Sequence, residues 1–172
     1  LPPTITSDVI TTAQYTWTPP AKILVRVVCR GTPSVSDKSV DLPAAVTHLG
    51  LGRSFVAEIW AKNADGSPNW LAVGGVDLLY DTDLLDATTD SLHHGAVFTN
   101  LAQGSVDDSS GLVDEFGGGV AVSMEDEQLG TTHWARLGYV SFVGGVVGTV
   151  TLSLDECSSV LWFRKTVAGT EV

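Results

Sequence analysis

The residues whose spacing suggests chemistry gather in the segment VDLLYDTDLLD, which ends in a run of aspartates at Asp81, Asp83 and Asp86. Carboxylates this close together are candidate ligands for Ca²⁺. An EF-hand loop beginning at Asp81 needs oxygen ligands at its first, third and fifth positions, Gly at the sixth and Glu at the twelfth. Only the first and third positions fit. A looser calcium site on these three aspartates is therefore the weaker alternative to a hydrated turn.

Other catalytic patterns are absent from the sequence. The remaining acidic groups fall at expected strand ends or in turns, whereas a glycosidase needs two carboxyl groups facing each other roughly 5–9.5 Å apart. Adjacent His93 and His94 point to opposite faces of a strand and cannot share a metal there. No HExxH, zinc-ligand spacing or GxSxG occurs. The sequence therefore predicts a protein that is not an enzyme and has no cofactor.

Two cysteines, Cys29 and Cys157, lie near opposite ends of the predicted domain. A disulfide bond between them would stabilise the fold by about 4–5 kcal/mol on the chain-entropy model. Two buried free thiols are the alternative, because the sequence does not give the distance between their Cα atoms.

The elements that would position these residues are β-strands. The hydrophobic pattern has a period of two, and Gly-, Asp-, Asn- and Ser-rich clusters such as LAQGSVDDSSG and FGGG separate the alternating segments as turns. A single helical turn fits only in residues 41–52. The pattern predicts an all-β sandwich or barrel, with strands at 22–30, 53–62, 71–81, 119–126, 134–143, 148–154 and 159–165.

The domain boundaries follow from composition. Residues 1–21 are polar and rich in Pro, which indicates a linker or a loosely attached edge strand. Residues 22–165 form the predicted sandwich, and residues 166–172 form a tail or the start of a linker.

The acidic net charge of the chain disfavours partners that are themselves negatively charged. Nine basic and 20 acidic residues give a formal charge of −11. Nucleic acid and anionic membranes would repel such a chain, and no apolar run is long enough to insert in a bilayer. Solubility, calcium or a basic partner would all suit this charge.

The tryptophans are candidates for sugar binding, because a row of exposed aromatic rings stacks on polysaccharide. Trp60, Trp134 and Trp162 fall in strand patterns and are expected to pack in the interior. Trp70 follows the turn NADGSPN and is the candidate for exposure, while Trp17 lies in the leading segment.

The order of these elements resembles the cohesin domain, the module that binds dockerin modules in extracellular bacterial assemblies. The segments that carry the resemblance are VRVV, GRSFVAEIWA, GGVDLLYDTDLLDA, LGYVSFVGGVVGTVTLSL and LWFRK, which together span residues 22–165. The segment VDLLYDTDLLD is the most telling, because it is similar to the family's alternating strand that ends in Tyr-Asp.

The resemblance implies a nine-stranded jelly-roll sandwich outside the cell or on its surface, without catalytic activity. It implies a dockerin partner on another protein or on the same chain, with calcium held chiefly by the dockerin. Val76, Leu78 and Tyr80 would be core. The docking residues it implies on one sheet face are Val73, Gly75, Asp77, Ser123, Glu125, Thr149, Thr151 and Ser153.

The sequence departs from the family at Gly74-Gly75, where cohesins often carry polar side chains. A pair of glycines in a strand indicates a bulge or a close approach of backbones. Segment 111–119 also has no place in the ordinary family pattern. Two other classes remain open: a carbohydrate-binding module of related sandwich fold, and a structural repeat of a bacterial surface protein.

Overall fold

The computed structural model describes residues 10–11, 14–17, 23–50, 52–63, 70–87, 89–119, 133–155, 164–167 and 170–171. These residues form two antiparallel sheets, which confirms the predicted all-β class. Residues 41–50 and 52, where the sequence allows a single helical turn, contain none. Among the described residues the one helical element is a 3₁₀ turn, η1 (Thr89–Ser91), so no helix there is long and apolar enough to cross a membrane.

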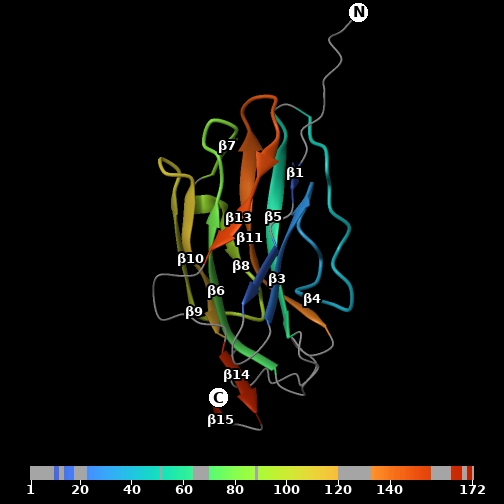
Figure 1. Cartoon of the computed structure of the whole chain (residues 1–172), viewed down its shortest axis with the longest axis vertical. Helices are drawn as coiled ribbons and strands as arrows, with labels where there is room; N and C mark the ends of the chain where they lie inside the picture. Colours follow the sequence, from blue (N-terminus) through green and yellow to red (C-terminus); the bar gives the residue numbers. More distant parts are fainter. Residues whose placement is uncertain are drawn as a thin grey trace, which may run out of the picture.

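The first sheet contains five strands in a continuous path, and two short strands extend it along β11 (Figure 1). Its central strands β5 and β11 pair over most of their lengths, from Ala135 opposite Ala61 to Val143 opposite Ser54. In order, the path is β2 (Gln14–Trp17), β3 (Ile23–Arg30), β5 (Ser54–Asn63), β11 (Trp134–Gly144) and β4 (Lys38–Ser39), with β7 (Leu85–Asp86) and β8 (Leu92–His94) also on β11.

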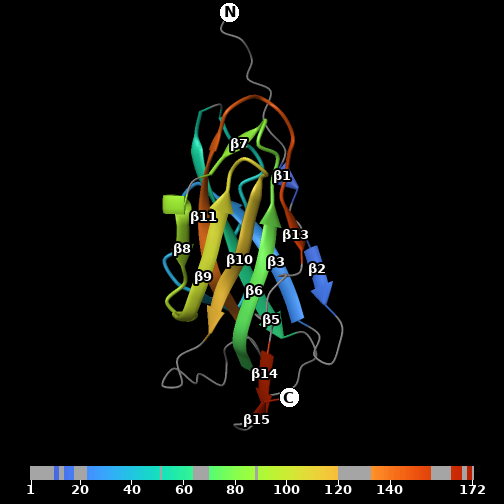
Figure 2. The ribbon, with the colours of Figure 1, turned by 90° about the vertical axis from the view of Figure 1, so that its left-hand side faces the viewer.

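The second sheet lies in front of β3, β5 and β11 when the molecule is turned by 90° (Figure 2). A separate parallel pair joins β1 (Ile10–Thr11) to β12 (Val150–Thr151). The second sheet consists of β15 (Thr170–Glu171), β14 (Arg164–Val167), β6 (Trp70–Leu79), β10 (Leu112–Gly119) and β9 (Asn100–Asp107), with β13 (Ser153–Asp155) also paired to β6.

The core fills the space between the two sheets. The alternation expected for the Tyr-Asp strand is confirmed, since Val76, Leu78 and Tyr80 are all buried in this core. The Tyr80 ring meets the Phe142 ring edge-on with centroids 4.9 Å apart, and Phe142 stacks on Phe55 at 5.5 Å. The Tyr80–Phe142 pair therefore joins the two layers, and Phe55 extends this aromatic cluster within the first sheet.

Besides the short strands β4, β7 and β8, the sequence pattern missed two eight-residue strands, β9 and most of β10. Their residues include LAQGSVD and FGGG, which were expected to be turns, and β10 begins seven residues before the strand predicted at 119–126. Of that predicted strand, residues 120–126 lie outside the described residues.

The glycines of β10 fit against β6 because they face glycines of that strand. Gly117 and Gly118 of β10 pair with Gly75 and Gly74 of β6. A Cβ atom on Gly117 would lie 2.0 Å from the Gly74 carbonyl oxygen. The double glycine thus marks a close approach of two backbones, one of the two outcomes expected from the sequence.

Candidate functional site: the outer face of the second sheet

The upper part of the second sheet aligns four strands in register. Leu78 of β6 pairs with Leu154 of β13 and Val113 of β10, and Val113 pairs with Val106 of β9. All four side chains pack in or against the core. Because neighbouring residues on a strand point to opposite faces, the rows on either side of this one point outward.

Two outward rows form what we call the acidic face. In the first row, Leu79 lies between Ser153 and Leu112, and Leu112 pairs with Asp107. Leu79 is 38% exposed, the largest exposure of an apolar side chain on β6 among those described. The second row lies on the other side of the inward row, two residues along each strand from the first. Together the two rows make up the acidic face: Leu79, Leu112, Ser153, Asp107, Asp155, Asp77, Asp114, Glu115 and Ser105.

A β-bulge increases the negative charge of the second row. The register between β10 and β6 shifts between Val113 and Phe116, and both of these side chains are buried. Two residues, Asp114 and Glu115, therefore occupy a stretch where a regular strand would turn one of them toward the core. Glu115 has a φ of 52°, a left-handed conformation that is uncommon for a residue other than glycine.

Asp77 holds this bulge in place. Its Oδ1 accepts a hydrogen bond of 2.8 Å from the backbone N–H of Glu115, and the residue is only 9% exposed. The Gln103 side chain of β9 donates a 3.2 Å hydrogen bond from Nε2 to Glu115 Oε2. Asp77 thus has a structural contact in the sheet as well as its position in the outward row.

Asp107 is the acidic residue at the edge of the first row. Both of its carboxylate oxygens accept hydrogen bonds from the following turn, at 2.5 Å from Ser109 Oγ and 2.8 Å from Ser110 Oγ. These hydrogen bonds lower the pKa of Asp107, because they favour its ionised form. The carboxylate is therefore firmly charged at neutral pH.

The docking residues expected from the resemblance are brought together only in part. Asp77 and Ser153 lie on adjacent strands of the acidic face, whereas Gly75 is buried. Thr149 and Thr151 are exposed, at the turn before β12 and on β12. Val73 has its backbone in β6 but its side chain is not described, and Ser123 and Glu125 lie outside the described residues.

The aspartates after the Tyr-Asp strand form a turn. Asp81 Oδ1 accepts a 2.9 Å hydrogen bond from the backbone N–H of Asp83, and the Asp81 carbonyl accepts another from Leu85. Asp81 therefore closes the turn, which agrees with the hydrated-turn interpretation. Asp83 and Asp86 are exposed. Within the described ranges, no group of three or more His, Cys, Asp or Glu side chains is placed to hold a metal ion.

Tyr80 connects this turn to the turn between β9 and β10. Its hydroxyl donates a 2.6 Å hydrogen bond to Asp108 Oδ1, which also accepts from the backbone N–H of Ala87 at 2.8 Å. Burial, the hydrogen bond and the nearby carboxylates all raise the pKa of Tyr80. This end of the acidic face is therefore held by buried contacts, and we assign it no reaction.

The outer face of the first sheet is covered in a different way. Residues 31–42, which we call the covering segment, cross this face, and Leu42 packs on a cluster of Val28, Trp60 and Trp134. Trp60 and Trp134 are thus packed as expected, while Trp162 and the side chains of Trp17 and Trp70 lie outside the described parts.

A buried ion-pair network fastens the covering segment. The Arg136 guanidinium pairs with Glu58 Oε1 through Nη1 and with Asp37 Oδ1 through Nη2, both at 2.5 Å. Glu58 is 0% exposed and also accepts hydrogen bonds from Ser34 Oγ at 2.8 Å and Trp60 Nε1 at 3.0 Å. A buried charge with this many partners is a structural element of the fold.

The remaining candidates have structural surroundings. Cys29 carries a free, buried thiol, and burial raises its pKa to about 12. Cys157, its proposed disulfide partner, lies outside the described residues. His93 stacks on Tyr139 with ring centroids 4.5 Å apart, and the His94 ring lies 5.1 Å from that of Phe116.

Comparisons with protein-family models, curated proteins and solved structures found no match to this chain.

Sequence reasoning missed most of the acidic face because it took β9 and β10 as turns. One signal in the sequence points to it directly: no Lys or Arg occurs between Lys62 and Arg136, an interval that supplies β6, β9 and β10 and most of the acidic residues. Charge segregation along the chain would have identified the acidic layer without knowledge of the strand boundaries.

Proposed function

We propose that this chain is a non-catalytic attachment module of the cohesin kind, which binds a dockerin module through the acidic face. The dockerin belongs to another protein or to the same chain, and calcium sits on the dockerin. In this proposal the two sheets belong to a nine-stranded sandwich with jelly-roll topology, and the protein acts outside the cell or at its surface.

The observation that supports this proposal is the register of β13, β6, β10 and β9. It places Leu79 beside Leu112 at the centre of the outer sheet surface and surrounds them with polar and acidic side chains. A central apolar contact with a polar rim is the usual composition of a protein-binding surface.

The rival function is binding of polysaccharide, which needs exposed aromatic rings. In the part of the chain that the structure describes, the exposed large apolar side chains are all aliphatic: Val35, Val40, Leu79, Leu101, Val143, Val146 and Val147. No observation on these residues favours sugar over protein, so the rival enters as an outcome of the test.

The test is calorimetric titration of the full chain with a panel of dockerin modules, with calcium and with chelator. We expect at least one dockerin to bind in a saturable manner, and binding to be lost with chelator because the dockerin loses its calcium. The variant Leu79→Asp should abolish this binding. Its control is Val147→Asp, at a side chain that is 50% exposed on the turn between β11 and β12.

Thermal melts of both variants establish that they fold before their binding is compared. Binding to no dockerin, together with retention of the chain on an insoluble glycan, would overturn the proposal. Equal loss of binding in Leu79→Asp and Val147→Asp would show that the docking surface is not the acidic face.

A further inference from the structure

The two layers of the sandwich differ in charge. The basic residues with described side chains are Arg26 and Arg30 on β3, Lys38 on β4, Arg53 before β5, Lys62 on β5 and Arg136 on β11. All of them belong to the first sheet or its connections. On the opposite layer, β6, β9, β10 and β13 contain no basic residue. The two basic residues of that sheet, Arg164 and Lys165, are on β14 and pair with Val73 and Leu71 at the start of β6, away from the acidic face at its other end.

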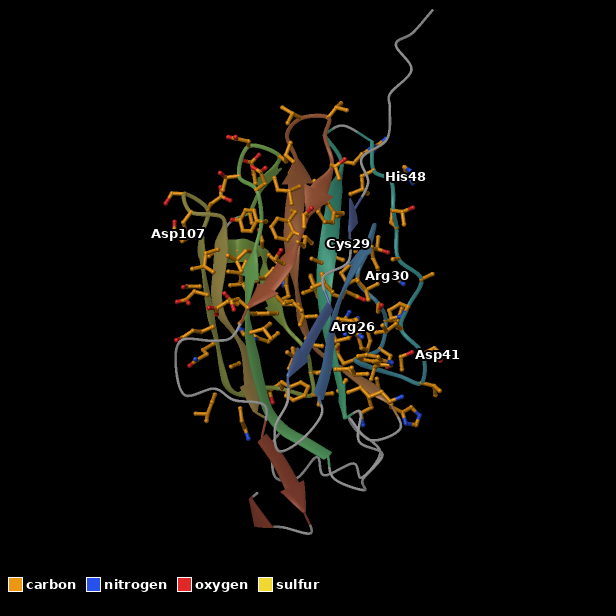
Figure 3. The ribbon with its side chains drawn as sticks, viewed as in Figure 1. Arg26, Cys29, Arg30, Asp41, His48 and Asp107 are labelled. Carbon is orange, nitrogen blue, oxygen red and sulfur yellow. The ribbon has the colours of Figure 1, made fainter. Side chains whose placement is uncertain are left out.

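Figure 3 shows Arg26 and Arg30 on the side of the first sheet, where Asp41 also lies, and Asp107 on the opposite side. The Arg136 charge is already matched by two buried carboxylates. The acidic face carries Asp107, Asp155, Asp77, Asp114 and Glu115 within its two outward rows.

This charge excludes several occupants of the exposed Leu79–Leu112 surface. A second copy docked face to face would bring together two sets of carboxylates, and like charges opposed across an interface cost several kcal/mol. Phosphate-bearing surfaces, whether nucleic acid or anionic lipid, meet the same repulsion. A protein segment with cationic side chains remains as the complementary occupant.

We infer that the acidic face takes a basic protein segment that places one apolar side chain on Leu79 and Leu112 and Lys or Arg side chains over the surrounding carboxylates. This inference rests on the proposed docking role of the face, and it adds the chemistry of the partner. Complementary charge at the rim acts mainly by steering the encounter, so association should be fast and should slow as salt is added.

The test selects the partner chemistry without assuming a dockerin. Random dodecapeptides displayed on phage are panned against the full chain, after depletion on the Leu79→Lys variant, and the recovered peptides are measured by surface plasmon resonance. We expect recovered sequences that combine Leu or Ile with flanking Lys or Arg, and association rates that fall about tenfold between low and physiological salt.

Matched variants separate the face from the net charge of the chain. Asp114→Asn with Asp155→Asn removes two charges from the acidic face, whereas Asp41→Asn with Asp90→Asn removes two exposed charges from the covering segment and from η1. We expect the first pair to slow association about tenfold and the second pair to change it less than twofold.

Two results would overturn the inference. One is recovery of peptides without enrichment in Lys or Arg. The other is equal slowing of association by the two double variants, which would make attraction a property of net charge. Failure of every dockerin to bind, with basic peptides still retained on the face, would instead count against the cohesin-like function alone.

Discussion

The carboxylate of Asp77 accepts the backbone N–H of Glu115 at 2.8 Å, from one strand of the second sheet to the bulge of the next. Asp77 is nearly buried and Glu115 lies in a left-handed backbone conformation. The hydrogen bond satisfies an amide that the irregular register removes from the strand ladder.

Replacing Asp77 with Ala should therefore destabilise the fold. The Glu115 N–H would lose its acceptor, which costs about 1–3 kcal/mol when a buried group is left unsatisfied. Asp77→Asn keeps an acceptor oxygen and should lose less than half of that. Urea denaturation of the two variants measures the difference, and equal losses would show that the hydrogen bond does not hold the bulge.

Removal of the Arg136 cation should be among the most damaging single changes. The variant Arg136→Met leaves Glu58 and Asp37 without their cation, and breaking a buried pair in this way costs about 3–5 kcal/mol. The double variant Arg136→Met with Glu58→Leu should lose less than the sum of the two single changes. A double-mutant cycle by chemical denaturation tests this, and strict additivity would contradict the coupling.

A methyl group at Gly117 should disrupt the pairing of β6 and β10. The added Cβ would lie 2.0 Å from the Gly74 carbonyl oxygen, so the backbones must separate. We expect Gly117→Ala to cost about 3 kcal/mol or more. Gly31→Ala is the control, because a Cβ there meets nothing within 4 Å, and its midpoint of thermal unfolding should stay within about 2 °C of the parent. Similar losses in both variants would argue against the close approach.

Alkaline pH should destabilise the fold through Cys29. Burial raises its pKa from 9.0 to about 12, so the folded state holds the thiol proton where the unfolded state releases it. The contribution is complete below pH 9 and is lost as the pH rises from 9 toward about 12, with a slope of about 1.4 kcal/mol per pH unit. Urea denaturation should therefore show a total loss of about 1.4 kcal/mol between about pH 8 and pH 10 in the parent and a smaller loss in Cys29→Ala. The same loss in both proteins would contradict the assignment.

Local alternation was enough to predict the all-β class and the inward row of the Tyr-Asp strand, because burial of every second residue leaves a direct trace in the sequence. Strands β9 and β10 left no such trace. Their glycines oppose glycines of β6, and the bulge at Asp114 and Glu115 interrupts the alternation. Both features depend on a neighbouring strand that is distant in the sequence. A search for alternation within a short sequence segment therefore cannot detect them.

The candidate site was predicted in part for the same reason. Asp77 and Ser153 were expected on a common face and lie on adjacent strands. Leu79 and Leu112, which form the centre of that face, were not expected, since the pairing that joins them spans a segment taken as a turn. The Arg136 network escaped notice because its ion pairs join residues 78 and 99 positions apart.

That separation has a consequence for synthesis on the ribosome. Glu58 and Asp37 are made long before Arg136, and the sheet position that buries Glu58 lies beside a strand that has not yet been translated. An early pairing of β3 with β5 would hold a carboxylate without its cation, a state that burial makes unfavourable. The covering segment should therefore fold onto the first sheet only after β11 has been translated. During synthesis, stable packing of Asp37 and Glu58 then depends on one residue, Arg136, that is translated much later.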